Sequence, residues 1–197
     1  MRPVLLMMLI SIISACTSSR YQHQYDFTPP TSSELKPEPV PKAEPRSVLG
    51  NPTSYEVLGQ RYQVLQQAFP VEQQGSASWY GMKFHGHQTS NGEIYDVYAF
   101  TAAHKTLPLP SYVRVTRTDS GASVVVRVND RGPFHPGRII DLSYAAAIKL
   151  NMHEQGTAPV RIEVLQPPQA HSERWLQLAA LTEATAALAL QQKVTAL

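Results

Sequence analysis

The chain of 197 residues contains a single cysteine, Cys16, so it has no intramolecular disulfide. Neither sign of charge dominates, because 17 Lys and Arg residues balance 15 Asp and Glu residues, and the basic residues are scattered along the chain. The sequence therefore lacks the dense positive surface of a nucleic-acid-binding domain. It also lacks a phosphate-binding loop, a dinucleotide fingerprint and a G-x-S-x-G turn, so neither nucleotide chemistry nor a serine nucleophile is expected.

An apolar stretch at residues 4–13 is too short to span a bilayer, which takes about 20 residues. It follows a positively charged start and ends in small residues directly before Cys16, which is the pattern of a secretory signal. We predict that residues 1–15 form a signal peptide that is removed on export.

The residues at the predicted cleavage point, "ISAC", resemble the lipobox of bacterial lipoproteins, in which the cysteine is acylated and becomes the mature N-terminus. The alternatives are a plain signal peptide with an incidental cysteine, or a buried thiol. Several acyl chains on Cys16 would anchor the protein stably to a membrane. Thr17, in place of an acidic residue, resembles the sorting signal for the outer membrane, so we expect a cell-envelope protein that faces the periplasm.

Residues 16–50 have the composition of a linker. Apolar residues are few, and prolines recur between charged residues, as in "PPTSSELKPEPVPKAEPR". Such a segment has too little apolar surface to build a core. We predict a disordered lipoprotein linker that tethers the following domain to a membrane.

Regular structure is predicted between residues 51 and 166. Runs of β-branched residues bounded by Gly, Pro or Asp are typical of strands, and alternation around Gly59 predicts a small hairpin. Ser143 is a suitable N-cap for a short, alanine-rich helix. The predicted elements are a hairpin at 55–65, strands at 75–81, 112–118, 123–129 and 160–165, and a helix at 143–150. The sequence thus predicts a small, mainly β barrel or sandwich.

Residues 167–197 begin with a second proline-containing linker. The stretch "RWLQLAALTEATAALALQQKV" then has the pattern of a strand running into a helix. Such a pair would leave one apolar face uncovered. We expect either a docked tail or the start of a further domain.

Two aspartates flank the turn that follows a valine-rich run. Asp130 ends the run, and Asp141 lies just before the predicted helix. Each has a structural alternative, because Asp stabilises turns by bonding its own backbone and also caps helix N-termini. Glu93, in the turn "TSNGE", is by itself an exposed loop acid.

The histidines point less clearly to chemistry. His104 lies in an apolar stretch, where a lone histidine is more often a hydrogen-bonded core residue than a catalyst. His85 and His87 are close together in "FHGH", but no cysteine or suitably spaced third ligand accompanies them. Neither a metal nor another cofactor is expected.

Four stretches together resemble the rare lipoprotein A (RlpA) family, over about residues 50–166. They are "ASWYGMKFHGHQTSNGEIYD", "AFTAAHKTLPLPSYVRVT", "VVVRVNDRGPFHPGRIIDLSYAAAIKL" and "APVRIEVL". The resemblance implies a six-stranded double-psi β-barrel, a fold shared with expansins and other wall-acting lytic enzymes. It also implies a lytic transglycosylase, a lyase that cleaves the glycan strands of peptidoglycan and prefers strands stripped of stem peptides.

The resemblance also assigns candidate catalytic residues. Glu93 in "NGE", His104 in "TAAH" and Asp130 in "NDRGP" match positions that the family uses for activity. Asp141 in "IDLS" matches an aspartate that related lytic barrels keep in their groove, although a capping role would also explain it.

Further residues of the same motifs are expected to complete the site. Asn129 and Arg131 flank Asp130 and are expected to support it. The side chains of Tyr80, Trp79 and Phe134 are expected to line a groove for sugar faces, although Trp79 in a strand is as typical of a core residue.

The implied reaction breaks the bond between N-acetylmuramic acid (MurNAc) and N-acetylglucosamine (GlcNAc) without water. A protonated carboxyl group gives its proton to the leaving oxygen, the muramic acid 6-hydroxyl closes a 1,6-anhydro ring, and the same carboxyl group then acts as base. Such an acid needs a raised pKa. We expect Asp130 in this role with Glu93 as its partner, or the two exchanged, and His104 orienting one of them.

Two other functions remain open from the sequence. One is a non-catalytic peptidoglycan-binding or wall-loosening lipoprotein, and the other is a structural or septal partner. Many family members end in a complete sporulation-related (SPOR) domain, whereas residues 167–197 resemble only its first strand and helix, which puts septal targeting in doubt. The expected partners are glycan strands, the outer membrane through Cys16 and, further, proteins of the divisome.

Overall fold

The computed structural model describes residues 25–30, 35–68, 72–166 and 188. The predicted signal peptide at residues 1–15, the predicted lipidation site Cys16 and nearly all of the tail at residues 167–197 lie outside the described residues. The chain divides into two compact units, Met1–Pro167 and Pro168–Leu197, and all strands found in the described residues belong to the first. Within the described ranges, no helix has the length and apolar character needed to cross a membrane.

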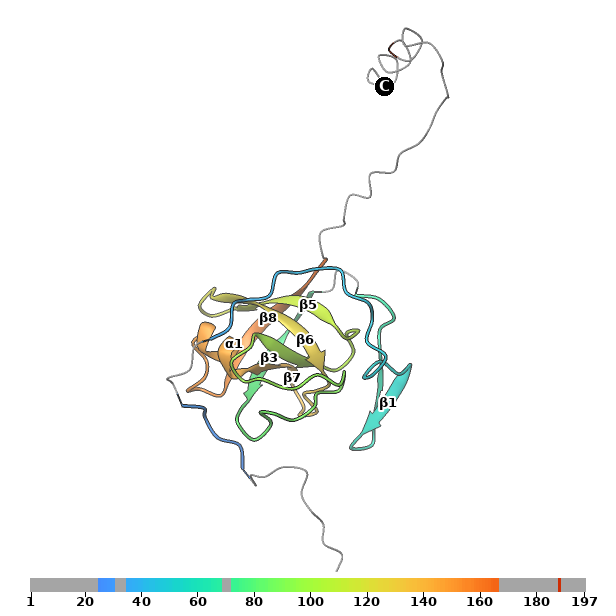
Figure 1. The fold of residues 1–197 in the computed structure, drawn as a ribbon. Helices are drawn as coiled ribbons and strands as arrows, with labels where there is room; N and C mark the ends of the chain where they lie inside the picture. The colour runs from blue at the N-terminus through green and yellow to red at the C-terminus, as the bar shows by residue number, and fades with distance from the viewer. Residues whose placement is uncertain (1–24, 31–34, 69–71, 167–187, 189–197) are drawn as a thin grey trace, which may run out of the picture. The chain divides into compact units, whose positions relative to one another are not determined.

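Six strands close into a barrel (Figure 1). Around the barrel they follow the order β3, β7, β4, β6, β5, β8. Their bounds are β3 Glu72–Tyr80, β4 Thr101–His104, β5 Ser111–Arg117, β6 Ser123–Asp130, β7 Arg138–Ser143 and β8 Thr157–Leu165. The pairs β3–β7 and β4–β6 are parallel, and the remaining neighbours are antiparallel. The mainly β fold and the six-stranded double-psi barrel implied by the resemblance are confirmed.

Alternate side chains of the strands fill the barrel. In β8 every second residue is buried, while the residues between them are exposed, and β6 likewise buries alternate valines. The buried residues of these two strands include Ala158, Val160, Ile162, Val164, Val124, Val126 and Val128. This is the period of two that is typical of a strand with one face on a core. Because the sequence carries this period, it located β3, β5, β6 and β8 to within three residues at each end.

The strands β4 and β7 were not predicted from the sequence. β4 is the four-residue run "TAAH", in which alanine has low strand propensity, and in β7 Asp141 interrupts the apolar residues. Each strand lies between two neighbours and pairs in parallel with one of them, so its hydrogen-bonding partners are distant in sequence. Pairing of that kind leaves no local pattern.

Outside the barrel, β1 (Ser54–Val57) and β2 (Gln60–Gln63) form the predicted hairpin. Leu58 and Gly59 connect the strands, and both have positive φ, 51° and 75°. Two consecutive residues of this conformation give the turn whose twist matches that of a hairpin. Gly59 adopts it without steric cost.

The predicted helix is also present, as α1 (Tyr144–Lys149) directly after β7. Ser143 is its N-cap, and the Ser143 Oγ accepts a hydrogen bond from the Ala146 N–H at 3.3 Å. Asp141 lies two residues earlier, within β7. The alternative that Asp141 caps the helix is therefore wrong, because a hydroxyl already occupies that role.

Residues 35–50, here called the strap, differ from the linker that composition predicts. The strap contains no helix or strand, but it lies along the outside of the barrel and leads to β1 (Figure 1). The Lys36 N–H donates to the Tyr98 carbonyl at 3.0 Å, and the Ser47 N–H donates to the Leu109 carbonyl at 2.8 Å. Polar groups of the strap thus find partners on the barrel surface, which composition does not reveal.

Candidate active site

Three neighbouring strands bring two of the predicted carboxylates into one row of the barrel wall. Asp130, the last residue of β6, pairs in register with Ala103 of β4, and Ala103 pairs in register with Asp141 of β7. Residues in register share a face of the sheet, so the aspartates lie on either side of Ala103, with their Cα atoms roughly 10 Å apart across the three strands. The small side chain of Ala103 leaves the space between the two carboxylates open.

A pocket of about 470 Å³ opens over this row. All three residues of the row line it, together with the last residue of β3 and residues of the loops after β3 and β6: Tyr80, Phe84, Gln88, Thr89, Ser90, Arg131, Gly132, Pro133 and Phe134. A second pocket of about 350 Å³ shares Pro133, Phe134 and Asp141 with the first and extends to Leu58 in the β1–β2 turn. The two pockets are adjacent through these shared residues and are together called the groove, and Asp141 lines both of them.

Asp130 is fixed through one of its two carboxylate oxygens. Its Oδ1 accepts hydrogen bonds from the Ser90 N–H at 2.8 Å, from the Ser90 hydroxyl and from the Arg131 N–H at 2.7 Å. Within the described part of the chain, no hydrogen bond reaches Oδ2. The carboxylate is therefore oriented by the loop at residues 89–93 and keeps one oxygen for a molecule in the groove.

Asp141 lies in a less polar setting. Burial raises its pKa, and the hydrogen bond from the Ser78 hydroxyl and the positive charges of Arg138 and Lys105 oppose this shift only in part. A raised pKa keeps part of the population protonated at higher pH than an ordinary aspartate. Asp141 thus has the electrostatic property required of a proton donor.

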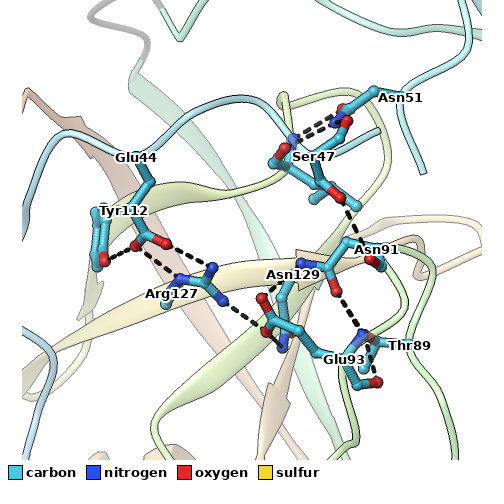
Figure 2. A network of polar contacts seen from close by, with 10 residues as sticks. Glu44, Ser47, Asn51, Thr89, Asn91, Glu93, Tyr112, Arg127 and Asn129 are labelled. Carbon is cyan, nitrogen blue, oxygen red and sulfur yellow. Dashed lines mark hydrogen bonds and ion pairs between the residues drawn. The ribbon is translucent and has the colours of Figure 1, made fainter. Parts of the chain in front are cut away.

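Glu93 has the opposite property (Figure 2). Its Oε2 accepts hydrogen bonds from Arg127 Nη1 at 2.7 Å and Asn129 Nδ2 at 3.0 Å, and its Oε1 accepts one from Asn91 Nδ2 at 2.9 Å. Burial alone would raise the pKa of Glu93, but these hydrogen bonds outweigh it, and the pKa is lowered. Glu93 is not among the residues that line the groove. It is a charged member of the network that holds the loop beside Asp130.

Arg131, the residue after Asp130, is itself held by hydrogen bonds of its side chain. Its guanidinium is more than half buried and donates to the carbonyl oxygens of Gly50 at 2.9 Å, His104 at 3.2 Å and Leu107, and to Asn51 Oδ1 at 3.0 Å. These bonds fix the start of the turn after β6. Asn129 and Arg131 flank Asp130 in the chain, but the side chain of neither bonds the Asp130 carboxylate.

His104 is buried, with 2% of its surface exposed. Its Nδ1 accepts hydrogen bonds from the Thr106 and Leu107 N–H groups at 3.2 and 3.1 Å, so its proton is on Nε2, which lies 3.3 Å from Gln73 Oε1. Burial and nearby positive charge lower the pKa of His104 to about 3. Among the described residues its ring bonds neither Asp130 nor Glu93, so the expected orienting hydrogen bond is not present.

Two of the three aromatic residues predicted for the groove line it, and the third does not. Tyr80 and Phe134 line it, and Phe84, which was not predicted from the sequence, joins them. Trp79 does not: its indole N–H donates to the His153 carbonyl at 3.1 Å, and its ring contacts Tyr144 with centroids 5.4 Å apart. The alternation of a strand directs Trp79 and Tyr80 to opposite faces.

Ser90, Ser78 and Ala103 are further site residues that were not predicted from the sequence. The two serines bond the aspartates, and Ala103 spaces them. No chemical property of Ser or Ala signals such a role, and the registers that reveal it exist only in the closed barrel. The described ranges contain no group of three or more His, Cys, Asp or Glu residues that could hold a metal ion.

Comparison with known proteins gives a consistent set of relatives. A family profile described as lytic transglycolase matches residues 72–162. The chain is 54% identical over 168 residues to the endolytic peptidoglycan transglycosylase RlpA of Vibrio cholerae, covering 83% of this chain and 64% of that protein. It is 56% identical over 138 residues to the protein of the same name from Pseudomonas aeruginosa strain UCBPP-PA14, covering 70% of this chain and 40% of that protein. The chain thus spans less than two thirds of these relatives' lengths.

Two solved structures resemble the barrel more distantly. The Streptomyces papain inhibitor matches 49% of this chain and 96% of its own with a TM-score of 0.40 and 22% identity. The expansin of Clavibacter michiganensis matches 50% of this chain and 52% of its own with a TM-score of 0.38 and 19% identity.

Proposed function

Because the barrel of this chain belongs to the RlpA family of lytic transglycosylases, we propose that the protein cleaves peptidoglycan glycan strands at internal bonds between MurNAc and GlcNAc and forms 1,6-anhydroMurNAc ends. We include in this proposal the preference for strands poor in stem peptides. The reaction is a lyase reaction, since no water enters the bond that breaks.

The observation that carries the proposal is the pair of carboxylates in one groove. Asp130 and Asp141 flank Ala103 in the same row of the barrel wall, and both line the groove. Cleavage of a glycosidic bond by two carboxyl groups needs one to protonate the leaving oxygen and the other to stabilise positive charge on the sugar. Aromatic rings beside them, Tyr80, Phe84 and Phe134, offer apolar surfaces for sugar faces.

We assign the acid to Asp141, whose pKa burial raises. Protonated Asp141 donates its proton to the oxygen at C4 of GlcNAc as the bond to C1 of MurNAc breaks. The 6-hydroxyl oxygen of the same MurNAc then bonds to C1, and its proton returns to the Asp141 carboxylate. Each cycle leaves the enzyme unchanged and needs no cofactor.

We assign Asp130 the stabilisation of the oxocarbenium-like transition state. Its Oδ1 is held by Ser90 and Arg131, so the carboxylate is already oriented before substrate arrives. This assignment differs from the one expected from the motifs, in which Asp130 is the acid and Glu93 its partner. Asp141 becomes the acid, and Asp130 takes the role of the partner. We make this change because burial raises the pKa of Asp141 and because Glu93 accepts a hydrogen bond from Arg127.

The cellular setting extends the proposal. We propose that the protein acts in the cell envelope, anchored to the outer membrane through acylated Cys16 and facing the periplasm, with glycan strands as its substrate and proteins of the divisome as its partners. The names of its relatives, which are peptidoglycan transglycosylases, support the substrate. The sequence resemblance to lipoproteins supports the anchor.

The proposal is tested with the chain from residue 17 on and purified glycan with or without stem peptides. Mass spectrometry of the products measures 1,6-anhydromuramic ends. We predict that Asp141→Asn and Asp130→Asn each lower the rate at least about 100-fold, the usual contribution of general acid–base or charge-stabilising groups. Glu154→Gln, an exposed carboxylate-to-amide change, serves as the control and should leave the rate unchanged.

Two outcomes would contradict the proposal. Glycan that binds to the wild-type protein without forming anhydro ends would favour the non-catalytic binding function. Products that persist in both aspartate variants would show that the chemistry takes place outside this groove.

A further inference from the structure

We propose that Glu44 in the strap is a positioning residue: through Arg127 it holds the loop at residues 89–93, and that loop holds Asp130. The expected effect on catalysis rests on the proposed function. The contacts between the strap, Arg127 and the loop do not depend on that function. Glu44 precedes residues 72–162, so the matched family region does not include it. The composition of the strap predicts a linker. The inference gives this segment a part in positioning the residues of the groove.

The first link joins the strap to the barrel (Figure 2). Arg127 Nε donates to Glu44 Oε1 at 3.0 Å and Arg127 Nη2 donates to Glu44 Oε2 at 2.9 Å, so the pair is bidentate. The Tyr112 hydroxyl also donates to Oε1. The side chains of Arg127 and Glu44 are 18% and 20% exposed. A paired, largely shielded contact of this geometry is stronger than an exposed ion pair.

The second link continues from the same guanidinium to the loop. The remaining nitrogen of Arg127, Nη1, donates to Glu93 Oε2 at 2.7 Å. One arginine therefore bridges a carboxylate of the strap and a carboxylate of the loop. The strap touches the loop again where the Ser47 hydroxyl donates to the Asn91 carbonyl at 3.3 Å.

The third link reaches the groove. Ser90, three residues before Glu93, donates both its N–H and its hydroxyl to Asp130 Oδ1. Asn129, the neighbour of Asp130, donates to Glu93. A shift of the loop therefore moves Ser90, which donates hydrogen bonds to Asp130, and Glu93, which accepts one from Asn129.

Loss of the Glu44 carboxylate would disturb each link in turn. Arg127 would keep its charge in a half-buried site with two nitrogens unpaired, which is unfavourable. The guanidinium would then turn toward the remaining carboxylate, Glu93, and compete with Asn129 for its Oε2. Displacement of a catalytic group by about 1 Å lowers rates by about 100-fold.

The test compares Glu44→Ala and Glu44→Gln with Glu38→Ala in the chain from residue 17 on. Glu38 is a matched control, because it also ties the strap to the barrel, through the Val125 N–H at 3.0 Å and Lys149 at 3.3 Å, but has no contact with Arg127. For Glu44→Ala we expect kcat to fall 10- to 100-fold with KM within about twofold of wild type. Glu44→Gln keeps an oxygen acceptor for Arg127 and should recover part of the loss.

Hydrogen–deuterium exchange gives a readout that does not depend on activity. We expect the N–H groups of residues 90–93 to exchange at least tenfold faster in Glu44→Ala and to keep wild-type rates in Glu38→Ala. Unchanged exchange of this loop in both Glu44 variants would overturn the inference, as would equal losses of kcat in Glu38→Ala and Glu44→Ala. A wild-type protein without anhydro products would refute the proposed function, and loop exchange would then decide the inference alone.

Discussion

Burial disfavours the charged form of two residues near the groove, with opposite chemical results. It raises the pKa of Asp141, an acid, and lowers the pKa of His104, a base. The raised pKa favours the protonated form of Asp141, which can donate a proton in the groove. Neutral His104 has already committed both ring nitrogens to Gln73 and to backbone N–H groups. At the scale of single residues, the aspartate is suited to proton transfer and the histidine to holding the start of the loop after β4.

The buried state of His104 predicts a pH-dependent stability. Its pKa is about 3 in the folded protein against an ordinary value of 6.5, so below pH 6.5 the unfolded chain binds a proton that the folded chain does not. His104 therefore does not lower the free energy of unfolding above pH 6.5. As the pH falls from 6.5 toward 3, this free energy decreases by about 1.4 kcal/mol per pH unit. We expect wild type to lose about 2 kcal/mol from this source between pH 7 and 5.

His104→Asn isolates this contribution. The asparagine Oδ1 can accept the Thr106 and Leu107 N–H groups as Nδ1 does, but it does not titrate. Urea unfolding at pH 7 and pH 5 should show a smaller decrease for the variant, by about 2 kcal/mol. Parallel decreases in the two proteins would mean that His104 is protonated in the folded state.

The row of Asp130, Ala103 and Asp141, which we propose to be catalytic, is a property of three strands together. β6 ends in Asp130, β4 contributes Ala103 and β7 contributes Asp141. The motifs identified both aspartates, and the valine-rich period identified β6. The motifs did not indicate that these residues lie on either side of an alanine, because β4 and β7 have no period of their own and pair with strands distant in sequence. The motif that contains Glu93 likewise does not indicate its hydrogen bond with Arg127, which is distant in sequence.

Substitution of the central residue of the row tests its arrangement. Ala103→Leu would fill the space between the aspartates, so we expect kcat/KM to fall at least about tenfold, with overpacking costing about 1–3 kcal/mol of stability. Ala103→Ser, a change of similar size to the original residue, should keep most of the activity. Circular dichroism melts would establish that both variants are folded in the assay. Full activity of the leucine variant would mean that the glycan does not pass over this row.

At the scale of the whole molecule, the barrel and the strap form one structure. Lys36 pairs with Asp96 at 2.6 Å, Glu44 pairs with Arg127, and backbone groups of the strap bond carbonyls of the barrel. These contacts spread over several strands and loops. The sequence could not reveal them, because a proline-rich segment rich in charge has the same composition whether it is free or attached to a surface.

Removal of the strap should therefore lower the stability of the barrel. We expect a chain that begins at residue 51 to lose on the order of 2 kcal/mol in its free energy of unfolding relative to a chain that begins at residue 35, since it lacks a shielded bidentate ion pair and several hydrogen bonds, partly offset by the entropy of ordering the strap. Removal of residues 168–197, which form a separate compact unit, is the control and should leave the urea midpoint unchanged. If the chain from residue 51 had the midpoint of the chain from residue 35, the folded unit would begin there, as composition predicts, and the strap contacts would contribute no net free energy.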